Sequence, residues 1–175
     1  MPTPEPVPIR PAVPDDAAAL AALGAETFHE TFEGTAPEDD LRRFLAETYS
    51  PARQAAELAD PAVQLFVAEA DGRLVGYAML RAGPPPAEVD GPAPVELARL
   101  YVRRSTIGAG LGHRLLARAL DEARGRGFRT VWLGVWEHNH RALAFYARHG
   151  FRDVGAHTFM VGGDAQRDRL MAAPL

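Results

Sequence analysis

Hydrophobic and polar residues repeat along this chain with two periods, one typical of strands and one typical of helices. Apolar runs and two-residue alternation predict strands at residues 7–10, 64–70, 74–81, 95–102, 130–135, 151–161 and 166–171. Apolar residues three and four apart predict helices over about 15–32, 38–49, 51–58, 111–124 and 139–149. Asp71-Gly72 predicts a tight hairpin turn between the second and third strands.

The order of these segments predicts the fold class. A length of 175 residues fits one domain, so we expect a single domain over residues 1–175. Strands interleaved with helices favour an α/β (α+β) protein in which one mixed sheet carries helices on both faces. Residues 83–94 are rich in proline and glycine, and we interpret them as a stiff surface loop.

Composition excludes several classes of protein. The chain has 23 acidic and 19 basic residues and a net charge of -4, which argues against a general nucleic-acid binder. It has no cysteine, so disulfide and thiol chemistry are excluded. It has no lysine, which excludes a Schiff base and the usual P-loop cation. We find no signal region and no apolar run of the ~20 residues that span a bilayer, and therefore expect a cytoplasmic protein without membrane contact.

A glycine-rich turn is the main chemical feature of the sequence. Gly108, Gly110 and Gly112 alternate where a strand passes into a helix, and Arg103 and Arg104 precede them. Glycine lets the backbone approach a ligand closely, and free N–H groups at a helix start favour a phosphate. A tight turn that only packs the helix on the sheet explains the glycines equally well. The G-x-G-x-G spacing matches neither a P-loop nor a dinucleotide-binding turn.

Histidine and serine positions suggest no further chemistry. His138 and His140 lack a third clustered ligand, so we expect no metal. Ser50 and Ser105 lack the context of a nucleophile elbow.

Two longer motifs resemble a known family. LARLYVRRSTIGAGLGHRLL and NHRALAFYARHGF resemble the GNAT superfamily of acyl-CoA-dependent N-acyltransferases. WLGVWEHNHRALAFYARHGF with GAHTFMVGGDAQRDRLM looks more narrowly like bacterial spermidine/spermine N-acetyltransferases. The resemblance implies a mostly antiparallel sheet of about seven strands, acetyl-CoA as cosubstrate without a metal, and an edge geometry compatible with a homodimer.

The resemblance also assigns a coenzyme A site. The glycine-rich turn is expected to bind the pyrophosphate, and the preceding strand to pair with the pantetheine arm as an added strand would. Ile107 stands where the family usually has Gln or Arg, which removes a side-chain contact but leaves the backbone amides. The residues implied are Leu100, Tyr101, Val102, Arg103, Arg104, Ile107, Gly108, Ala109, Gly110, Leu111, Gly112, Asn139 and Tyr146.

Asn139 and Tyr146 lie seven residues apart, or two helical turns, and so share one helix face. In the family this Asn binds the coenzyme A arm and this Tyr is the general acid for the departing thiolate. Taken alone, Asn139 also fits a helix cap and Tyr146 also fits a core residue.

Direct transfer to an amine needs a group that accepts its proton. Glu96 on the central strand is our first candidate, and Glu137 and His138 are the alternatives. A plain strand carboxylate explains Glu96 equally well.

The acceptor side is expected to lie along the first helices. Phe28, Glu30, Phe32 and Glu137 are the substrate-binding candidates, because carboxylates and apolar rings suit a small polycation such as a polyamine. A solvated acidic helix face over core aromatics is the alternative explanation. The expected activity is acetylation of a primary amine, with a protein N-terminus or an antibiotic amine as other acceptors and a non-catalytic acyl-CoA sensor as the other function class.

Overall fold

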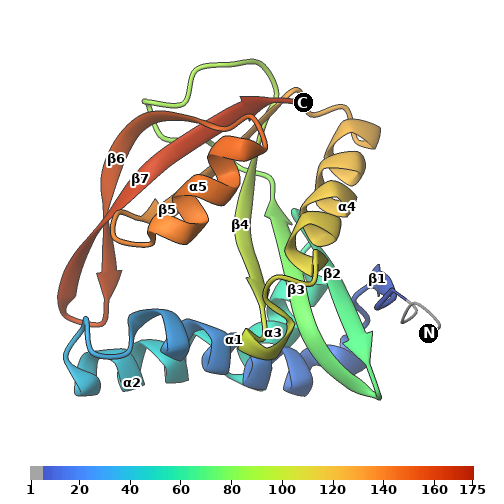
Figure 1. Cartoon of the computed structure of the whole chain (residues 1–175), viewed down its shortest axis with the longest axis vertical. Helices are drawn as coiled ribbons and strands as arrows, with labels where there is room; N and C mark the ends of the chain where they lie inside the picture. Colours follow the sequence, from blue (N-terminus) through green and yellow to red (C-terminus); the bar gives the residue numbers. More distant parts are fainter. Residues whose placement is uncertain (1–5) are drawn as a thin grey trace.

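The computed structural model describes residues 6–175 and contains one seven-stranded sheet with helices on both faces (Figure 1). The strands are β1 (Ile9–Pro11), β2 (Val63–Ala70), β3 (Arg73–Arg81), β4 (Pro94–Val102), β5 (Thr130–Trp136), β6 (Arg152–Val161) and β7 (Asp164–Pro174). The α-helices are α1 (Ala17–Phe32), α2 (Glu38–Thr48), α3 (Pro51–Ala59), α4 (Leu111–Gly125) and α5 (His140–Arg148), with short 3-10 turns at Pro14–Asp16 and Arg104–Thr106. The predicted fold class is confirmed.

The strands lie in the order β1-β2-β3-β4-β5-β7-β6. Only β4 and β5 run parallel, and every other neighbouring pair is antiparallel. A parallel pair needs a long crossover connection, and here α4 supplies it.

Each face of the sheet has its own core. Leu115 and Ala119 of α4 and Tyr146 of α5 pack with apolar residues of β2 to β5 and β7 on one face. Leu20 and Leu23 of α1 pack against β2 and β3 on the other face. Burial of one apolar stripe per helix follows from the 3.6-residue spacing seen in the sequence.

The segment between β3 and β4 is a surface loop, as predicted, and it also covers part of the sheet. In Figure 1 it is the light-green loop that reaches over the upper end of β7. Val89 in this loop is buried and packs with Trp132, Leu170 and Ala172. The loop therefore closes a part of the sheet that would otherwise expose Trp132.

The parallel pair β4 and β5 separates soon after it forms. Its pairing covers only Pro94↔Thr130, Val95↔Val131 and Glu96↔Trp132. From there β4 continues to Val102 with β3 alone, while β5 continues to Trp136 with β7. We call the space between residues 97–102 of β4 and 133–136 of β5 the β4–β5 gap.

The β6–β7 hairpin reaches across to the second helix. Figure 1 shows the hairpin descending until its turn meets α2. At that turn the N–H of Gly163 donates a 2.8 Å hydrogen bond to the Oδ1 of Asp40. An aromatic cluster fills the space behind, with Phe28 and Phe32 of α1 against Phe159 of β6. This contact fixes β6 and β7 beside the gap.

Several element boundaries differ from the sequence prediction. The predicted first strand, residues 7–10, is shifted to Ile9–Pro11, and β7 extends over Asp164–Pro174 instead of residues 166–171. The strand β7 lies between β5 and β6, and pairing on both edges carries it beyond its apolar stretch.

A buried ion pair joins α3 to β4. Glu57 accepts two hydrogen bonds from the Arg99 guanidinium, at 2.7 and 3.0 Å, and the two side chains are 6% and 10% exposed. Removing one partner of such a pair leaves the other charge buried without compensation. Arg99 lies on β4 three residues after Glu96, the last residue of β4 that pairs with β5.

Replacing this carboxylate tests the role of the pair. Glu57→Ala is expected to lower the free energy of unfolding by about 3 kcal/mol, because Arg99 stays buried without its counter-charge. Urea unfolding followed by circular dichroism measures the change. Asp39→Ala is the control, since its ion pair with Arg42 is exposed and should change stability by no more than about 0.5 kcal/mol. Equal losses in both variants would contradict the assignment.

Candidate functional site

The turn after β4 presents free backbone N–H groups. The N–H groups of Thr106, Ile107 and Ala109 bond to carbonyls inside the turn. At the start of α4 the N–H groups of residues 110–113 find no acceptor among the hydrogen bonds of the described residues. Gly110, with a φ of 76°, is the residue before the helix; a side chain is strained in that conformation. The turn therefore offers converging donors of the kind that bind phosphate.

The two arginines of the turn differ in their surroundings. Arg103 forms an ion pair with Glu26 of α1, and its Nε donates a 2.9 Å hydrogen bond to the carbonyl of Leu74. Arg103 therefore ties the turn to α1 and β3. Arg104 and Ile107 are exposed beside the free N–H groups.

Among residues 6–175, the edge of β4 that faces the gap has no strand partner beyond Glu96. Leu100, Tyr101 and Val102 lie on this stretch, half-buried, with β3 on their other side. An unpaired strand edge offers backbone donors and acceptors to an extended ligand. Their predicted contact with the pantetheine arm stays a prediction.

On the other side of the gap, α5 carries the predicted Asn139 and Tyr146. The Oδ1 of Asn139 accepts a 3.1 Å hydrogen bond from the N–H of Ala142, so the side chain caps α5. Its amide NH2 remains available to a ligand. The Tyr146 ring packs against Phe145 and Phe151 and is 8% exposed. Burial raises the pKa of Tyr146 well above its usual value, so the phenol keeps its proton.

Glu96 lies at the point where β4 and β5 separate. Its carboxylate is 3.8 Å from the Arg81 guanidinium. Burial raises the pKa of Glu96, and the positive charge of Arg81 opposes that shift. A carboxylate with a raised pKa is a better proton acceptor; the role of Glu96 as the base stays a prediction.

A second titratable pair lies near Glu96 and was not identified from the sequence. His157 of β6 is paired in register with Asp168 of β7, and its Nε2 is 3.7 Å from the Asp168 Oδ2. Burial raises the pKa of Asp168 to about 6, and His157 opposes the shift. Both residues belong to the motif GAHTFMVGGDAQRDRLM. The only sign of their pairing in the sequence is their spacing of eleven residues across a hairpin turn, and this spacing shows a pair only once the register of the two strands is known.

The predicted acceptor wall is mostly structural. Phe28 and Phe32 are each 3% exposed and stack on one another at 4.4 Å, which leaves a ligand little surface to contact. Glu30 is half-exposed on α1. Of the neighbouring carboxylates, Glu26 pairs with Arg103 and Asp40 holds the β6–β7 turn.

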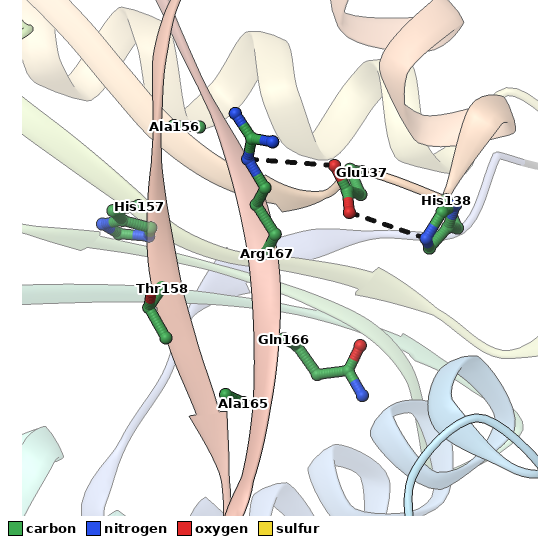
Figure 2. Close-up of a pocket in the computed structure, with 8 residues that line it drawn as sticks. All are labelled: Glu137, His138, Ala156, His157, Thr158, Ala165, Gln166 and Arg167. Atoms are coloured by element: carbon green, nitrogen blue, oxygen red, sulfur yellow. Dashed lines mark ion pairs between the residues drawn. The ribbon is translucent and has the colours of Figure 1, made fainter.

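Glu137 borders a separate open cavity of about 500 Å³ (Figure 2). Figure 2 shows Arg167 and His138 directed toward Glu137 from either side, and the Nε of Arg167 and the Nε2 of His138 are 4.0 and 3.6 Å from its carboxylate. His157 is also a lining residue of this cavity. Glu137 and His138, the alternative bases, therefore interact with one another at the end of β5.

Residues 6–175 contain no group of three potential metal ligands. Within the same range, none of the helices combines the length and the apolar character that a bilayer crossing requires.

Comparisons with known proteins agree with this geometry. The model of the acetyltransferase (GNAT) family matches residues 25–151. An uncharacterised N-acetyltransferase of Lactobacillus delbrueckii subsp. lactis is 33% identical over 160 residues, covering 91% of this chain and 92% of its own. A mycothiol acetyltransferase of Streptomyces coelicolor is 35% identical over 153 residues, which span 85% of this chain and 43% of that protein.

Solved structures show the same fold. A crystal structure of the PaiA N-acetyltransferase of Thermoplasma acidophilum in complex with coenzyme A superimposes with a TM-score of 0.79 and 21% identity, covering 97% of this chain and 99% of that one. Family match, relatives and fold thus point to one family. The chain belongs to the GNAT acetyltransferase family and is an N-acetyltransferase.

Proposed function

We propose that the protein transfers the acetyl group of acetyl-CoA directly to a cationic primary amine, with linear polyamines such as spermidine and spermine as the first candidates. The observation that carries the proposal is the β4–β5 gap, with the glycine-rich turn at the end of β4, Tyr146 in the core under α4 and α5, and Glu96 at the point where the two strands separate. Glu96 and Asp168 bring carboxylates to the acceptor side. Negative charge there attracts an ammonium group and disfavours anionic acceptors.

The donor is expected to bind along the free edge of β4. Backbone N–H groups at residues 110–113 would hold its pyrophosphate, with Arg104 nearby and Asn139 contributing its amide. An N–H of the unpaired β4 edge would polarise the thioester carbonyl. Holding acetyl and amine together in this gap supplies several kcal/mol of the barrier reduction through proximity.

The protons in the reaction can be followed individually. The acceptor enters as an ammonium ion and loses one proton to become nucleophilic, and its nitrogen loses a second as the new C–N bond forms. Glu96 accepts one of these two protons. When the C–S bond breaks, the thiolate takes the proton of the Tyr146 phenol, which the second nitrogen proton then replaces. The products are the amide, coenzyme A and one proton released to solvent.

An amine carried on a larger molecule is the second candidate acceptor. Relatives named mycothiol acetyltransferase support it, because they match 80–85% of this chain at 35–36% identity. Paired carboxylates on α1 and α2 also weaken the argument for a polycation. A protein N-terminus and an antibiotic amine belong to the same group of acceptors.

Homodimer formation and a cytoplasmic location remain predictions.

Removing the phenol hydroxyl tests the role of Tyr146. Tyr146→Phe is expected to lower kcat at least about 10-fold, because the thiolate then leaves without a proton donor. Coenzyme A affinity should stay within about twofold, since the ring is retained. Thiol release is measured with acetyl-CoA against spermidine, spermine, amino sugars and peptides with free N-termini.

Tyr77→Phe is the matched control, because the Tyr77 hydroxyl on β3 is buried without a hydrogen-bond partner in the part of the chain described. It should retain wild-type kcat. Wild-type activity in Tyr146→Phe would contradict the role of the phenol. Binding of coenzyme A without thiol release from any amine would instead favour the non-catalytic sensor.

A glycine substitution tests the turn. Gly110→Ala is expected to weaken coenzyme A binding at least about 10-fold in calorimetric titration, because a side chain at a φ of 76° strains the backbone that presents the N–H groups. Gly125→Ala at the other end of α4 is the control, since an added Cβ there meets no atom within 4 Å. Equal affinities in the two variants would count against a pyrophosphate site at residues 107–112.

A further inference from the structure

We propose that His157 accepts the first proton from the acceptor ammonium and that Asp168 holds its imidazole in place for this step. The inference rests on the proposed acetyl transfer and adds a second basic group to Glu96. His157 would touch the substrate and so act as a catalytic residue, while Asp168 acts as a positioning residue.

The pair is adjacent to the gap, at Gly134 of β5. A Cβ built on Gly134 would lie 3.1 Å from both the Asp168 Oδ2 and the His157 Nε2. Gly134 is exposed although it lies in the middle of a sheet, because β4 and β5 stop pairing at Trp132, two residues earlier. The imidazole and the carboxylate therefore border open space where the acceptor enters.

Asp168 has an unused acceptor. Its Oδ1 is buried and has no hydrogen-bond partner in the described part of the chain, and the residue as a whole is 7% exposed. A buried carboxylate oxygen without a donor is costly and marks a place where a ligand N–H or a proton is expected. Because Oδ2 already faces the His157 Nε2, the pair resembles a carboxylate that orients an imidazole base.

The pair also lies within electrostatic range of the predicted catalytic groups. Burial raises the pKa of Glu96, and Arg81 and His157 oppose that shift. Burial also raises the pKa of Tyr101 on the free edge of β4, with smaller contributions from Tyr49, Tyr146 and Asp168. Groups from β4, α5, β6 and β7 thus converge on the same gap. An amine nitrogen between Glu96 and His157 would face the thioester that lies between β4 and Tyr146.

The two bases divide the two protons. The ammonium passes its first proton to the neutral His157 imidazole, and the resulting imidazolium is stabilised by the Asp168 carboxylate. The neutral amine attacks the thioester carbonyl, the C–N bond forms, and the second nitrogen proton passes to Glu96. The C–S bond breaks as Tyr146 protonates the thiolate, Glu96 returns a proton to the phenol, and His157 releases its proton to solvent.

Other charged groups surround His157. Asp168 pairs with it from β7, and Glu96, Arg81 and Arg99 lie toward β4. The loop between β3 and β4 brings Glu88 against Gly155, two residues away on β6. The remaining lining residues of its cavity that carry or can carry charge are Glu137, His138 and Arg167.

The decisive experiment is the pH profile of His157→Gln. At pH 7, kcat/KM for the best amine is expected to fall about 100-fold, while coenzyme A affinity stays at the wild-type value. The deficit should shrink as pH rises toward 10, because solvent then supplies the neutral amine. His140→Gln, an exposed histidine at the start of α5, is the control and should match wild type throughout. A deficit below twofold, or one that is independent of pH, would overturn the proposal.

Asp168→Asn separates catalysis from folding. Activity is expected to fall about 10-fold. Because the folded-state pKa of Asp168 is raised to about 6, the wild-type protein loses stability as pH rises through that value, whereas the variant does not. The melting temperature of the variant relative to wild type should therefore increase between pH 5 and pH 8. An active variant, or a less stable variant at pH 8, would contradict the positioning role.

Gly134→Ala tests the space itself. Its added Cβ would crowd the His157 Nε2 and the Asp168 Oδ2 at 3.1 Å without a backbone penalty, so KM for the amine is expected to rise at least about 10-fold with unchanged coenzyme A binding. An unchanged KM would contradict entry of the acceptor at this point. If wild-type protein binds coenzyme A but releases thiol with no amine, the proposed acetyl transfer fails. If only the proposal for His157 fails, the wild-type protein is still active with an amine.

Discussion

The parallel pairing of β4 and β5 stops after three residue pairs, and the rest of the site depends on this interruption. Backbone groups along a strand normally find partners in the next strand. Here residues 97–102 of β4 lose that partner, yet they cannot bend away, because β3 pairs with them on one side and the Glu57–Arg99 ion pair holds them from α3. The result is a rigid open edge in the middle of a sheet. A ligand with an extended arm can complete it.

The same interruption explains why chemical groups from distant parts of the chain meet. The helix that follows β4 begins at the gap, so its free N–H groups and the strand edge face one ligand. The helix that follows β5 brings Tyr146 to one side. The β6–β7 hairpin, fixed to α2 through Asp40, brings His157 and Asp168 to the other. Tyr146 and the His157–Asp168 pair therefore lie on opposite faces of the sheet beside the same gap.

The sequence predicted the elements better than the surroundings of their side chains. Periodicity located α1 to α5 and nearly all strands, because burial of one apolar face decides each of them. The glycine spacing alone singled out the turn after β4, whereas its expected ligand and the role of Tyr146 came from the family resemblance. Contacts between distant side chains were not predicted. Arg103 forms an ion pair with Glu26, and Phe28 and Phe32 are buried in the core. His157 and Asp168 required the register of a hairpin, which the apolar pattern of two half-exposed strands specifies weakly.

Asp168 lowers the stability of the folded protein, and its place beside the gap gives a functional reason for that cost. A buried carboxylate with a raised pKa and an unpaired oxygen destabilises the folded state at neutral pH. Packing alone would favour an apolar residue there, since Leu170 and Ala172 on the same strand are well buried. Gly134 opposite adds to the argument, because an exposed glycine in a central strand gives up side-chain packing. Both residues reduce the stability of the fold at the same place. Gly134 enlarges the space beside the gap and Asp168 makes it polar, as expected where a functional requirement opposes packing.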